Sequence, residues 1–437
     1  MTRKEFIEGI ALSAAAVAVG GVSGNEASAA EKTRKSKTAK SSEKVLEMRR
    51  KAAHRIRRVI VNNDGNDNRW DRGGDLEVIT PELLLAKRSL PLAEAPVDTV
   101  FYCDGVTFVY SHRSKFAESE HRMGKDVVDK FFWDRGTDAL QITTEYFHQH
   151  GKEVFWSMRM NDNHDSKINE LLSQFKKDHP ELLVGYNEKK ILYPRGKFNC
   201  FDFSHSKIHD MVVESCREVI DNYDVDGIEL DFFRHPAYFK EQFLGKEVTS
   251  EHCDMMTGTI RRIRKALDAR AMERGRAALL AVRVPDSPEY GRAIGVDWLS
   301  WVKEGLVDLV IGGDYFKCGT WREFGKIGRD YNIPVYACLE QRRLVTMVGK
   351  DLEGKAELGS IEELWRDEAY AAWQGGVNGI YMFNRFDPDD PILQMVGNPR
   401  KLEKLKAVPR ESYGNNKGYN DPGYWVKGGR ALRHIPE

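Results

Sequence analysis

Residues 225–236 read VDGIELDFFRHP, and the rest of the chain can be ordered around this stretch. Its first half is typical of a buried strand, and its second half is a charged and aromatic cluster that ends at a proline. Side chains alternate between the two faces of a strand, so Glu229 and Asp231 share one face while Ile228 and Leu230 share the other. Two carboxylates on one face of so apolar a strand are costly unless cations pair with them or chemistry uses them.

The same pattern, an apolar run followed by polar residues, recurs along the chain with helical segments between the runs. Besides the stretch above, we expect strands near residues 58–63, 97–104, 153–160, 278–284, 307–311, 334–339 and 377–383. Eight apolar strands alternating with helices predict an α/β fold, a (β/α)8 TIM barrel with enlarged loops. An open, doubly wound sheet is the alternative. It would favour a glycine-rich phosphate turn after the first strand, where residues 63–67 read NDGND instead.

The N-terminal residues are expected to direct export. Residues 1–30 combine a positive start, a run of small apolar residues and Ala-Ser-Ala at 27–29, which is typical of a secretory signal peptide. The order TRKEFI resembles a twin-arginine signal with lysine in the second arginine position, and an uncleaved amphipathic anchor is the alternative. We expect a basic flexible linker and short helix at 31–57, the barrel at 58–408 and a C-terminal extension over its surface at 409–437. The predicted location is the periplasm or the outside of the cell.

The composition narrows the classes of function. Among 437 residues, 67 basic and 67 acidic side chains balance, which argues against a dedicated nucleic-acid binder. No segment after the signal peptide approaches the about 20 apolar residues that a membrane-spanning helix needs. The six cysteines are widely and irregularly spaced, so we expect mostly buried thiols, with one or two disulfides left open. The chain shows no P-loop, HExxH or GxSxG motif, and neither a metal nor a cofactor is expected.

In a barrel of this kind the catalytic residues lie at the carboxyl ends of the strands. Acids, cations and aromatic residues gather at those positions here, which is typical of glycoside hydrolysis, since it needs one acid at the leaving oxygen and one carboxylate at the anomeric carbon. We therefore predict a carbohydrate substrate. The candidate substrate-binding residues are Asp64, Asp104, Arg159, Glu229, Arg234, His235, Arg283, Tyr315, Asn384 and Arg385.

Residues 226–236 resemble the signature strand of the glycosyl-hydrolase-like family 10 barrels, and residues 201–205, FDFSH, resemble a second stretch of that family. The resemblance implies an exported eight-stranded barrel that acts on glycans, with Asp231 as a site carboxylate. It does not supply the second catalytic residue. The strand is also similar to the chitinase pattern DGxDxDxE, but Phe233 stands where the catalytic glutamate would be, which argues against substrate-assisted chitinase chemistry.

The predicted catalytic residues are Asp231, Asp314 and Glu340. Asp231 is expected to be the nucleophile, Asp314 is slightly favoured as the acid/base, and Glu340 is held nearly level with it. A separation of about 5 Å between the two carboxyl groups would give retention and about 6.5–9.5 Å would give inversion. Glu229, two residues deeper, is expected to pair with a barrel arginine such as Arg283.

Some alternatives stay open. The arginines at adjacent strand ends, Arg159, Arg234 and Arg283, suit a uronate or sulfate group, or they neutralise the nearby acids. A carbohydrate-binding barrel without catalysis would bind glycans and release no reducing ends. A non-glycan hydrolase or lyase is a third possibility, because a fold does not fix chemistry. The sequence makes no prediction of the oligomeric state.

Overall fold

The computed structural model of the chain describes residues 42–65, 67, 79–115, 120–121, 127–166, 172–194, 196–345 and 360–434. The predicted signal peptide lies outside the described residues, as do residues 31–41 of the predicted linker and short helix. Residues 42–53 are helical, and the Arg49 side chain of this helix donates to Asp308 at 2.9 Å. The short helix expected before the barrel is therefore present and is tied to it.

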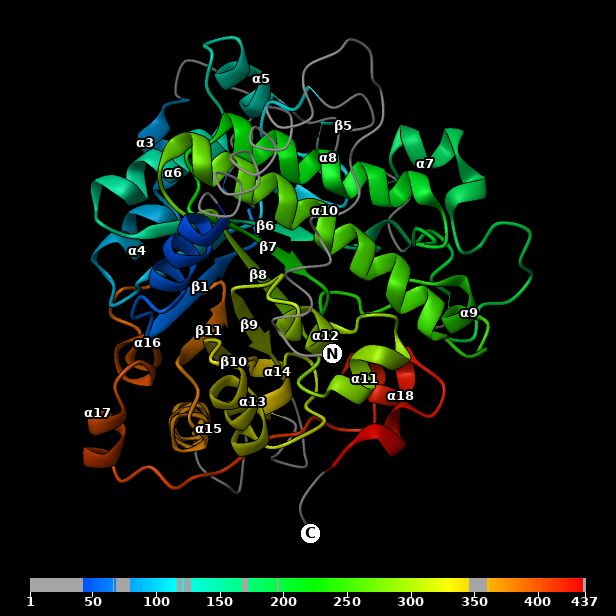
Figure 1. The fold of residues 1–437 in the computed structure, drawn as a ribbon. Coiled ribbons are helices and arrows are strands. Elements are labelled where there is room, and N and C mark those ends of the chain that lie inside the picture. Colours follow the sequence, from blue (N-terminus) through cyan, green and yellow to red (C-terminus); the bar gives the residue numbers. More distant parts are fainter. Residues whose placement is uncertain are drawn as a thin grey trace, which may run out of the picture.

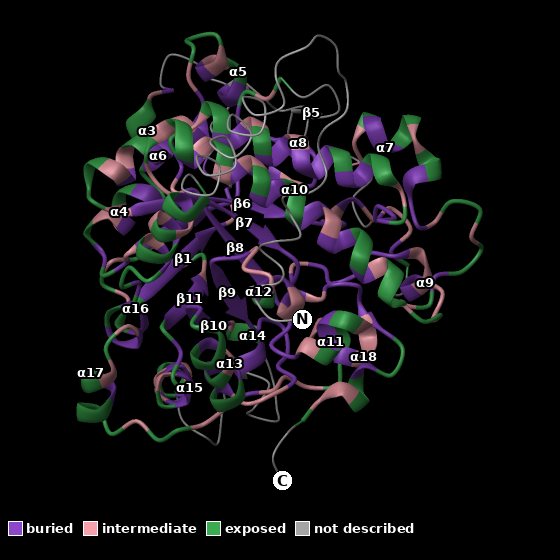
Figure 2. Cartoon of the chain, in the orientation of Figure 1, coloured by how far each residue is buried: buried purple, intermediate pink, exposed green. Residues whose placement is uncertain are grey.

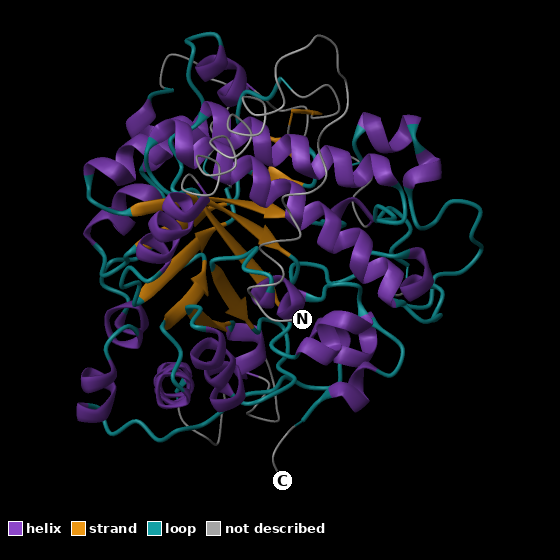
Figure 3. Cartoon of the chain, viewed as in Figure 1, coloured by secondary structure: helices purple, strands orange, loops and turns teal. Residues whose placement is uncertain are grey.

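Eight parallel strands close into a barrel, as predicted, with helices around the outside (Figure 1, Figure 3). Around the barrel the order is β1-β11-β10-β9-β8-β7-β6-β2, so the chain runs round the ring in sequence. β1 pairs with both β2 and β11, which closes the ring and rules out the open sheet. The strands are β1 (Val59–Asn63), β2 (Thr99–Tyr102), β6 (Glu153–Arg159), β7 (Gly227–Asp231), β8 (Leu279–Val284), β9 (Leu309–Gly312), β10 (Val335–Leu339) and β11 (Gly379–Phe383).

Most helices lie between strands, on the outer face of the barrel. The long ones are α8 (Ser206–Asn222), α10 (Ser250–Arg274), α13 (Trp321–Tyr331) and α15 (Ile361–Gly375). The shorter helices are α3 (Pro81–Leu85), α4 (Ser89–Glu94), α5 (Val127–Trp133), α6 (Ala139–Gln149), α7 (Gln174–Asp178), α9 (Lys240–Phe243), α11 (Pro288–Ala293), α12 (Trp298–Lys303), α14 (Gln341–Val345), α16 (Pro391–Val396), α17 (Pro399–Lys404) and α18 (Pro422–Trp425). Thr80 caps α3, because its hydroxyl accepts the N–H of Leu83, and Pro81 follows at the first helical position.

The loop after β2 contains an element that the sequence did not indicate. β3 (Gly105–Val106), β4 (Val109–Tyr110) and β5 (Glu120–His121) form a separate small sheet. The segment that follows is broken into α5 and α6, because Gly136 has a φ of +78° and Asp138 caps the second helix.

The interior of the barrel is an apolar plug with polar residues at one level. Phe101 and Phe155 stack inside it with ring centroids 4.6 Å apart. The strands are the most completely buried part of the chain (Figure 2). Gly227 opens β7 where a side chain would not fit, since a Cβ there would lie 2.4 Å from the ring of Phe155. Glu229 and Asp231 point inward from β7, above this plug.

The C-terminal extension lies against the loops that follow the barrel strands (Figure 1). The Tyr290 hydroxyl of α11 donates to the carbonyl of Pro422 at 2.7 Å, and Gln242 donates to the carbonyl of Trp425 at 2.9 Å. All six cysteines are buried and free, so the disulfides left open by the sequence do not form. Among the described residues, no helix is both long and apolar enough to cross a membrane.

Candidate active site

One buried arginine organises the carboxylates at the carboxyl end of the barrel. Arg283 of β8 is fully buried; its Nη2 lies 2.6 Å from Oδ2 of Asp231 and its Nη1 lies 2.6 Å from Oδ2 of Asp314. The guanidinium carbon also lies 4.5 Å from the centroid of the Phe383 ring. A buried cation requires such compensation. Arg283 thereby joins the end of β7 to the loop after β9.

Asp231 is surrounded by donors. Besides Arg283, its Oδ1 accepts the backbone N–H groups of Phe233 and Arg234, both at 3.0 Å. A carboxylate has about four lone-pair positions, and three are filled here. Asp231 is thus fixed in one orientation, with 2% of its surface exposed.

Glu229 does not pair with Arg283, contrary to expectation. The strand register explains this, because Arg283 lies level with Asp231, whereas Glu229 lies level with Ser157 on one side and Ala281 on the other. Oε2 of Glu229 accepts from the Ser157 hydroxyl at 2.5 Å, from the Tyr381 hydroxyl at 3.1 Å and, more weakly, from Asn62 at 3.4 Å. Complete burial, helped by the charge of Asp231, raises the pKa of Glu229 to about 8. Glu229 is therefore protonated at neutral pH.

The two candidates for the acid/base role have different surroundings. Asp314 is almost completely buried, and burial raises its pKa despite the ion pair with Arg283. Glu340 is partly exposed and accepts the backbone N–H groups of Arg342 and Arg343 at 2.5 and 3.2 Å. Desolvation and the nearby charge of Asp314 raise the pKa of Glu340 to about 7. Glu340 is thus the accessible carboxyl that changes protonation near neutral pH.

A second cluster of predicted residues meets around Asp64, at the ends of β1, β6 and β11. The guanidinium groups of Arg88 and Arg159 form ion pairs with the Asp64 carboxylate, and the Asn384 amide donates to its Oδ2 at 2.9 Å. Burial alone would raise the pKa of Asp64, but the charges of Arg159 and Arg88 outweigh it and lower the pKa to about 2. Arg159 also contacts Asp162 at 3.1 Å. Arg88 had not been singled out in the sequence, because it lies far from any strand end.

Two predicted substrate-binding residues are engaged within the protein. Oδ2 of Asp104 accepts hydrogen bonds from the backbone N–H and the ring Nδ1 of His112. Its Oδ1 accepts the indole N–H of Trp156 at 2.8 Å. Both residues of the Asp104–His112 pair are buried; the attraction of Asp104 outweighs desolvation and raises the pKa of His112 to about 10. Arg385 pairs with Asp390, and its guanidinium carbon lies 4.6 Å from the centroid of the Trp365 ring. These contacts hold Asp104 and Arg385 within the protein, and their contact with substrate stays a prediction.

Arg234, His235 and Tyr315 lie together beside the carboxylates. Nη1 of Arg234 donates to the Tyr315 hydroxyl at 3.2 Å, and this hydroxyl donates back to the carbonyl of Arg234 at 3.1 Å. His235 is buried, and Nδ1 accepts the N–H of Asn163 at 3.4 Å. Burial holds the pKa of His235 well below its ordinary value, so the ring is neutral.

The C-terminal extension supplies an aromatic wall that was missed in the sequence. The Trp425 ring stacks on Tyr315 with centroids 6.2 Å apart and an angle of 14°, and Tyr419 lies 5.5 Å from Tyr315. Tyr419 also meets His235, at 6.0 Å, and it is partly exposed. The density of aromatic residues in the extension was a signal for this wall, but nothing in the sequence located its target.

Asp162, His164 and His235 are the one group of described residues that could hold a metal ion, with a possible ligand atom of each within 4.8 Å of the others. Two imidazoles and a carboxylate suit a transition metal. Both oxygens of Asp162 are already bound, however, by His164 at 2.7 Å and by Arg159 at 3.1 Å. The adjacent guanidinium opposes a divalent cation, so the arrangement is better described as a hydrogen-bonded network.

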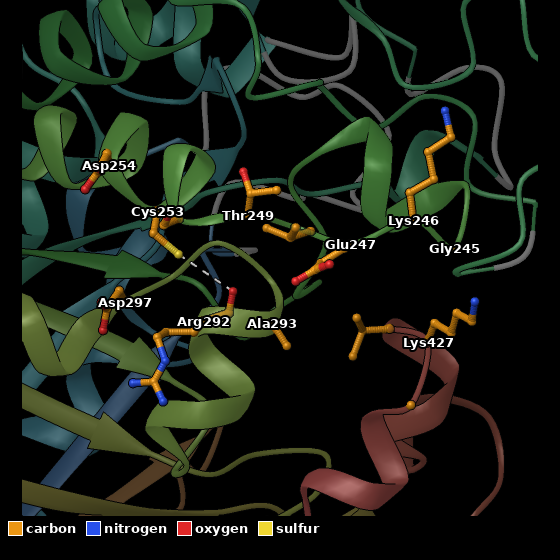
Figure 4. A pocket seen from close by; sticks show the side chains of 14 residues that line it. Gly245, Lys246, Glu247, Thr249, Cys253, Asp254, Arg292, Ala293, Asp297 and Lys427 are labelled. Carbon is orange, nitrogen blue, oxygen red and sulfur yellow. Dashed lines mark hydrogen bonds between the residues drawn. The ribbon is translucent and has the colours of Figure 1, made fainter.

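A pocket of about 680 Å³ lies apart from these residues, between the loop before α10, α11 and the end of α18 (Figure 4). Its wall carries charges of both signs, including Glu247, Lys246 and Arg292. The Cys253 thiol at its edge donates to the carbonyl of Arg292, and burial raises the pKa of this thiol to about 11, which makes it unreactive. None of the candidate catalytic residues lines this pocket.

Neither a protein-family model nor a curated protein matches the sequence, so the resemblance to family 10 stays a prediction. Among solved structures, the chain is similar to α-L-fucosidase isoenzyme 2 from Paenibacillus thiaminolyticus, at 14% identity and a TM-score of 0.47 over 80% of this chain and 49% of that one. It is similar to a GH36 α-galactosidase from Geobacillus stearothermophilus, at 13% and 0.43 over 80% and 42%, and to the PgaB glycoside hydrolase domain from Bordetella bronchiseptica, at 12% and 0.43 over 79% and 99%. The chain spans about half the length of the fucosidase and less than half of the galactosidase. Identities this low leave the reaction to be judged from the chain's own side chains.

Proposed function

We propose that the protein is a glycoside hydrolase that cleaves a polysaccharide or oligosaccharide by a two-carboxylate mechanism. The observation that carries this proposal is the contrast between two carboxyl groups, Asp231 at the end of β7 and Glu340 just after β10. Asp231 is held by three donors, whereas the accessible Glu340 has a pKa of about 7. Environments that separate the protonation of neighbouring carboxyl groups are what an acid and a nucleophile require.

Glu340 is our candidate for the general acid/base. A general acid works best when its pKa lies near the operating pH, and Glu340 meets this condition while it is partly exposed. Asp314, which the sequence slightly favours, is bound to Arg283 and has 1% of its surface exposed. Its charge instead helps to keep the proton on Glu340.

Asp231 is our candidate for the carboxylate at the anomeric carbon. Its Oδ1 and Oδ2 are oriented by two backbone N–H groups and Arg283, and one lone-pair position is left for the substrate. In a retaining reaction this oxygen would form the bond to the anomeric carbon while Glu340 protonates the departing oxygen, and Glu340 would then take a proton from the attacking water. In an inverting reaction Asp231 would instead accept the proton of that water.

The partly exposed residues around this centre suit a sugar. Tyr419 and Phe383 offer ring faces, and Asp64 with Asn384 offers acceptors and a donor for hydroxyl groups. The predicted signal peptide supports action outside the cytoplasm, where polysaccharides are met. We infer from the predicted signal peptide that the enzyme is exported, and from the side chains around the centre that it binds a sugar.

A reducing-end assay of the mature chain, across neutral, uronate-containing and sulfated polysaccharides, tests the proposal. Wild type and the surface control Glu362→Gln should release reducing ends equally, while Glu340→Gln and Asp231→Asn should be at least 100-fold slower. Azide should restore cleavage to an Asp231→Gly variant if Asp231 is a nucleophile. Unchanged hydrolysis by Asp231→Asn would refute its role.

A carbohydrate-binding barrel without catalysis is the second candidate. It is favoured by the near-complete burial of Asp231 and Asp314, which form a closed triad with Arg283 like a purely structural ion-pair network. This candidate predicts glycan binding with no release of reducing ends. A non-glycan hydrolase or lyase would neither bind glycans nor release reducing ends from them.

A further inference from the structure

We infer that Arg234 forms a subsite for an anionic substituent, a carboxylate or sulfate, of the bound sugar chain. This inference rests on the proposed function, because it names the class of substrate at the same site. The sequence places three arginines at neighbouring strand ends, where each could bind an oxyanion or neutralise the acids nearby. The structure separates them.

Two of the three arginines are bound to carboxylates. Arg283 contacts Asp231 and Asp314, and Arg159 contacts Asp162 at 3.1 Å and Asp64 at 3.9 Å. Their positive charges balance acids of the barrel. The Nε of Arg283 has no hydrogen-bond partner, but its two terminal nitrogens already lie against carboxylates.

Arg234 differs from both. Among the residues that the structure describes, no carboxylate oxygen lies within 4.0 Å of its guanidinium nitrogens. Its one side-chain hydrogen bond goes to a neutral phenol, that of Tyr315, at 3.2 Å, and its buried Nε has no hydrogen-bond partner. A largely buried guanidinium with an unused N–H is short of an anion, and this planar fork matches a carboxylate or sulfate.

A second cation lies near the same aromatic wall. Lys197 is buried, and its Nζ donates to the side-chain carbonyl of Asn163 at 2.9 Å and lies 5.7 Å from the centroid of Tyr419. No carboxylate forms an ion pair with it among the described residues. The Tyr419 ring also lies 5.5 Å from the ring of Tyr315, whose hydroxyl accepts from Arg234, so the aromatic wall contacts both cations.

These contacts define the ligand's chemistry. A sugar ring can lie on Tyr419 while an acidic substituent of that ring reaches Arg234, with Lys197 adding to the positive potential. A neutral sugar would leave the Nε of Arg234 without a partner. The site therefore discriminates an anionic chain from its neutral counterpart.

The test measures binding in a Glu340→Gln background, so that the ligand is not consumed. Titration calorimetry compares uronate oligosaccharides with the same chains after carboxyl reduction, and sulfated with desulfated chains. We expect the preferred anionic chain to bind at least tenfold more tightly than its neutral counterpart. Arg234→Gln should abolish this preference, so that its affinities for the anionic and the neutral chain agree within about twofold. Arg322→Gln, which removes an exposed arginine of α13, should leave the preference intact.

The uronate and sulfate arms identify the substituent, and Arg234→Lys should keep only part of the preference, because lysine lacks the planar fork. Equal affinity for charged and neutral chains, or a preference that survives Arg234→Gln, would overturn the inference. The two proposals fail separately. Selective binding that depends on Arg234, with no hydrolysis by the wild type, keeps the subsite and removes the catalysis. Equal hydrolysis of charged and neutral chains keeps the catalysis and removes the subsite.

Discussion

Glu229 offers the sharpest test of the electrostatics in the barrel. Burial and the charge of Asp231 raise its pKa to about 8, so folding at neutral pH requires this side chain to take up a proton. The folded pKa lies above the unfolded value of 4.5, and the stability of the wild type therefore falls as the pH rises from about 4.5 to about 8. Replacement by glutamine removes this dependence, since an amide has the same shape and does not titrate.

The size of the effect follows from the shift. Each pKa unit corresponds to about 1.4 kcal/mol. Between pH 5 and pH 7 the free energy of unfolding of the wild type should therefore fall by about 2–3 kcal/mol relative to that of Glu229→Gln. A constant offset is superposed, because the amide N–H groups would occupy the position of Oε1, which has no hydrogen-bond partner. That offset costs about 1–3 kcal/mol and does not depend on pH.

Urea denaturation of both proteins at half-unit steps from pH 5 to pH 8 measures the difference directly. The other titrating groups are common to the two chains, so their contributions largely cancel. The exposed Glu362→Gln should follow the wild-type curve throughout. Curves for Glu229→Gln and the wild type that run parallel across this range would refute the assignment of a protonated, buried Glu229.

Three further predictions concern Glu340, Arg283 and the Asp162–His164–His235 group. The rate of hydrolysis should fall as the pH rises through about 7, the pKa of Glu340, because the proton donor is lost, and Glu340→Gln should abolish this limb of the pH–rate profile. Arg283→Met should lower the free energy of unfolding by about 3–5 kcal/mol in urea titrations, because it leaves Asp231 and Asp314 buried without their cation, and the loss should shrink at acid pH as Asp314, whose pKa burial raises, takes up a proton. Chelation with EDTA should change neither the thermal midpoint nor the rate, because both oxygens of Asp162 are already bound by His164 and Arg159; a fall in either would show that the Asp162–His164–His235 group holds a metal.

The fold could be predicted because barrel strands carry their pattern locally. An apolar run, a polar end and a helix cap lie within a few residues of one another, as at Thr80 or along β7. That Glu229 and Asp231 share one face of the strand also follows from strand alternation alone. The small sheet of β3, β4 and β5 could not be foreseen, since its strands are only two residues long.

The partners within the site could not be predicted, because register decides them. Arg283 and Asp231 are 52 residues apart, and they meet because β7 and β8 place them at the same level of the barrel. Glu229 lies two residues deeper on the same strand, and it therefore meets Ser157 and Tyr381 instead. For the same reason no pattern in the sequence indicates that Asp104 meets His112, or that Tyr419 of the extension returns to Tyr315.

The balance of charge explains why one carboxyl group near this centre has a pKa suited to acid catalysis. Glu229, Asp231, Asp314 and Glu340 are all buried or half-buried, and the two terminal nitrogens of Arg283 bind only Asp231 and Asp314. The other two lack this ion pair in a largely desolvated place, and their pKa values rise to about 8 and about 7. Of these, Glu229 is fully buried at the deeper level, whereas Glu340 is partly exposed. A proton that is both accessible and held near neutral pH is therefore found on Glu340, where desolvation and the charge of Asp314 raise the pKa.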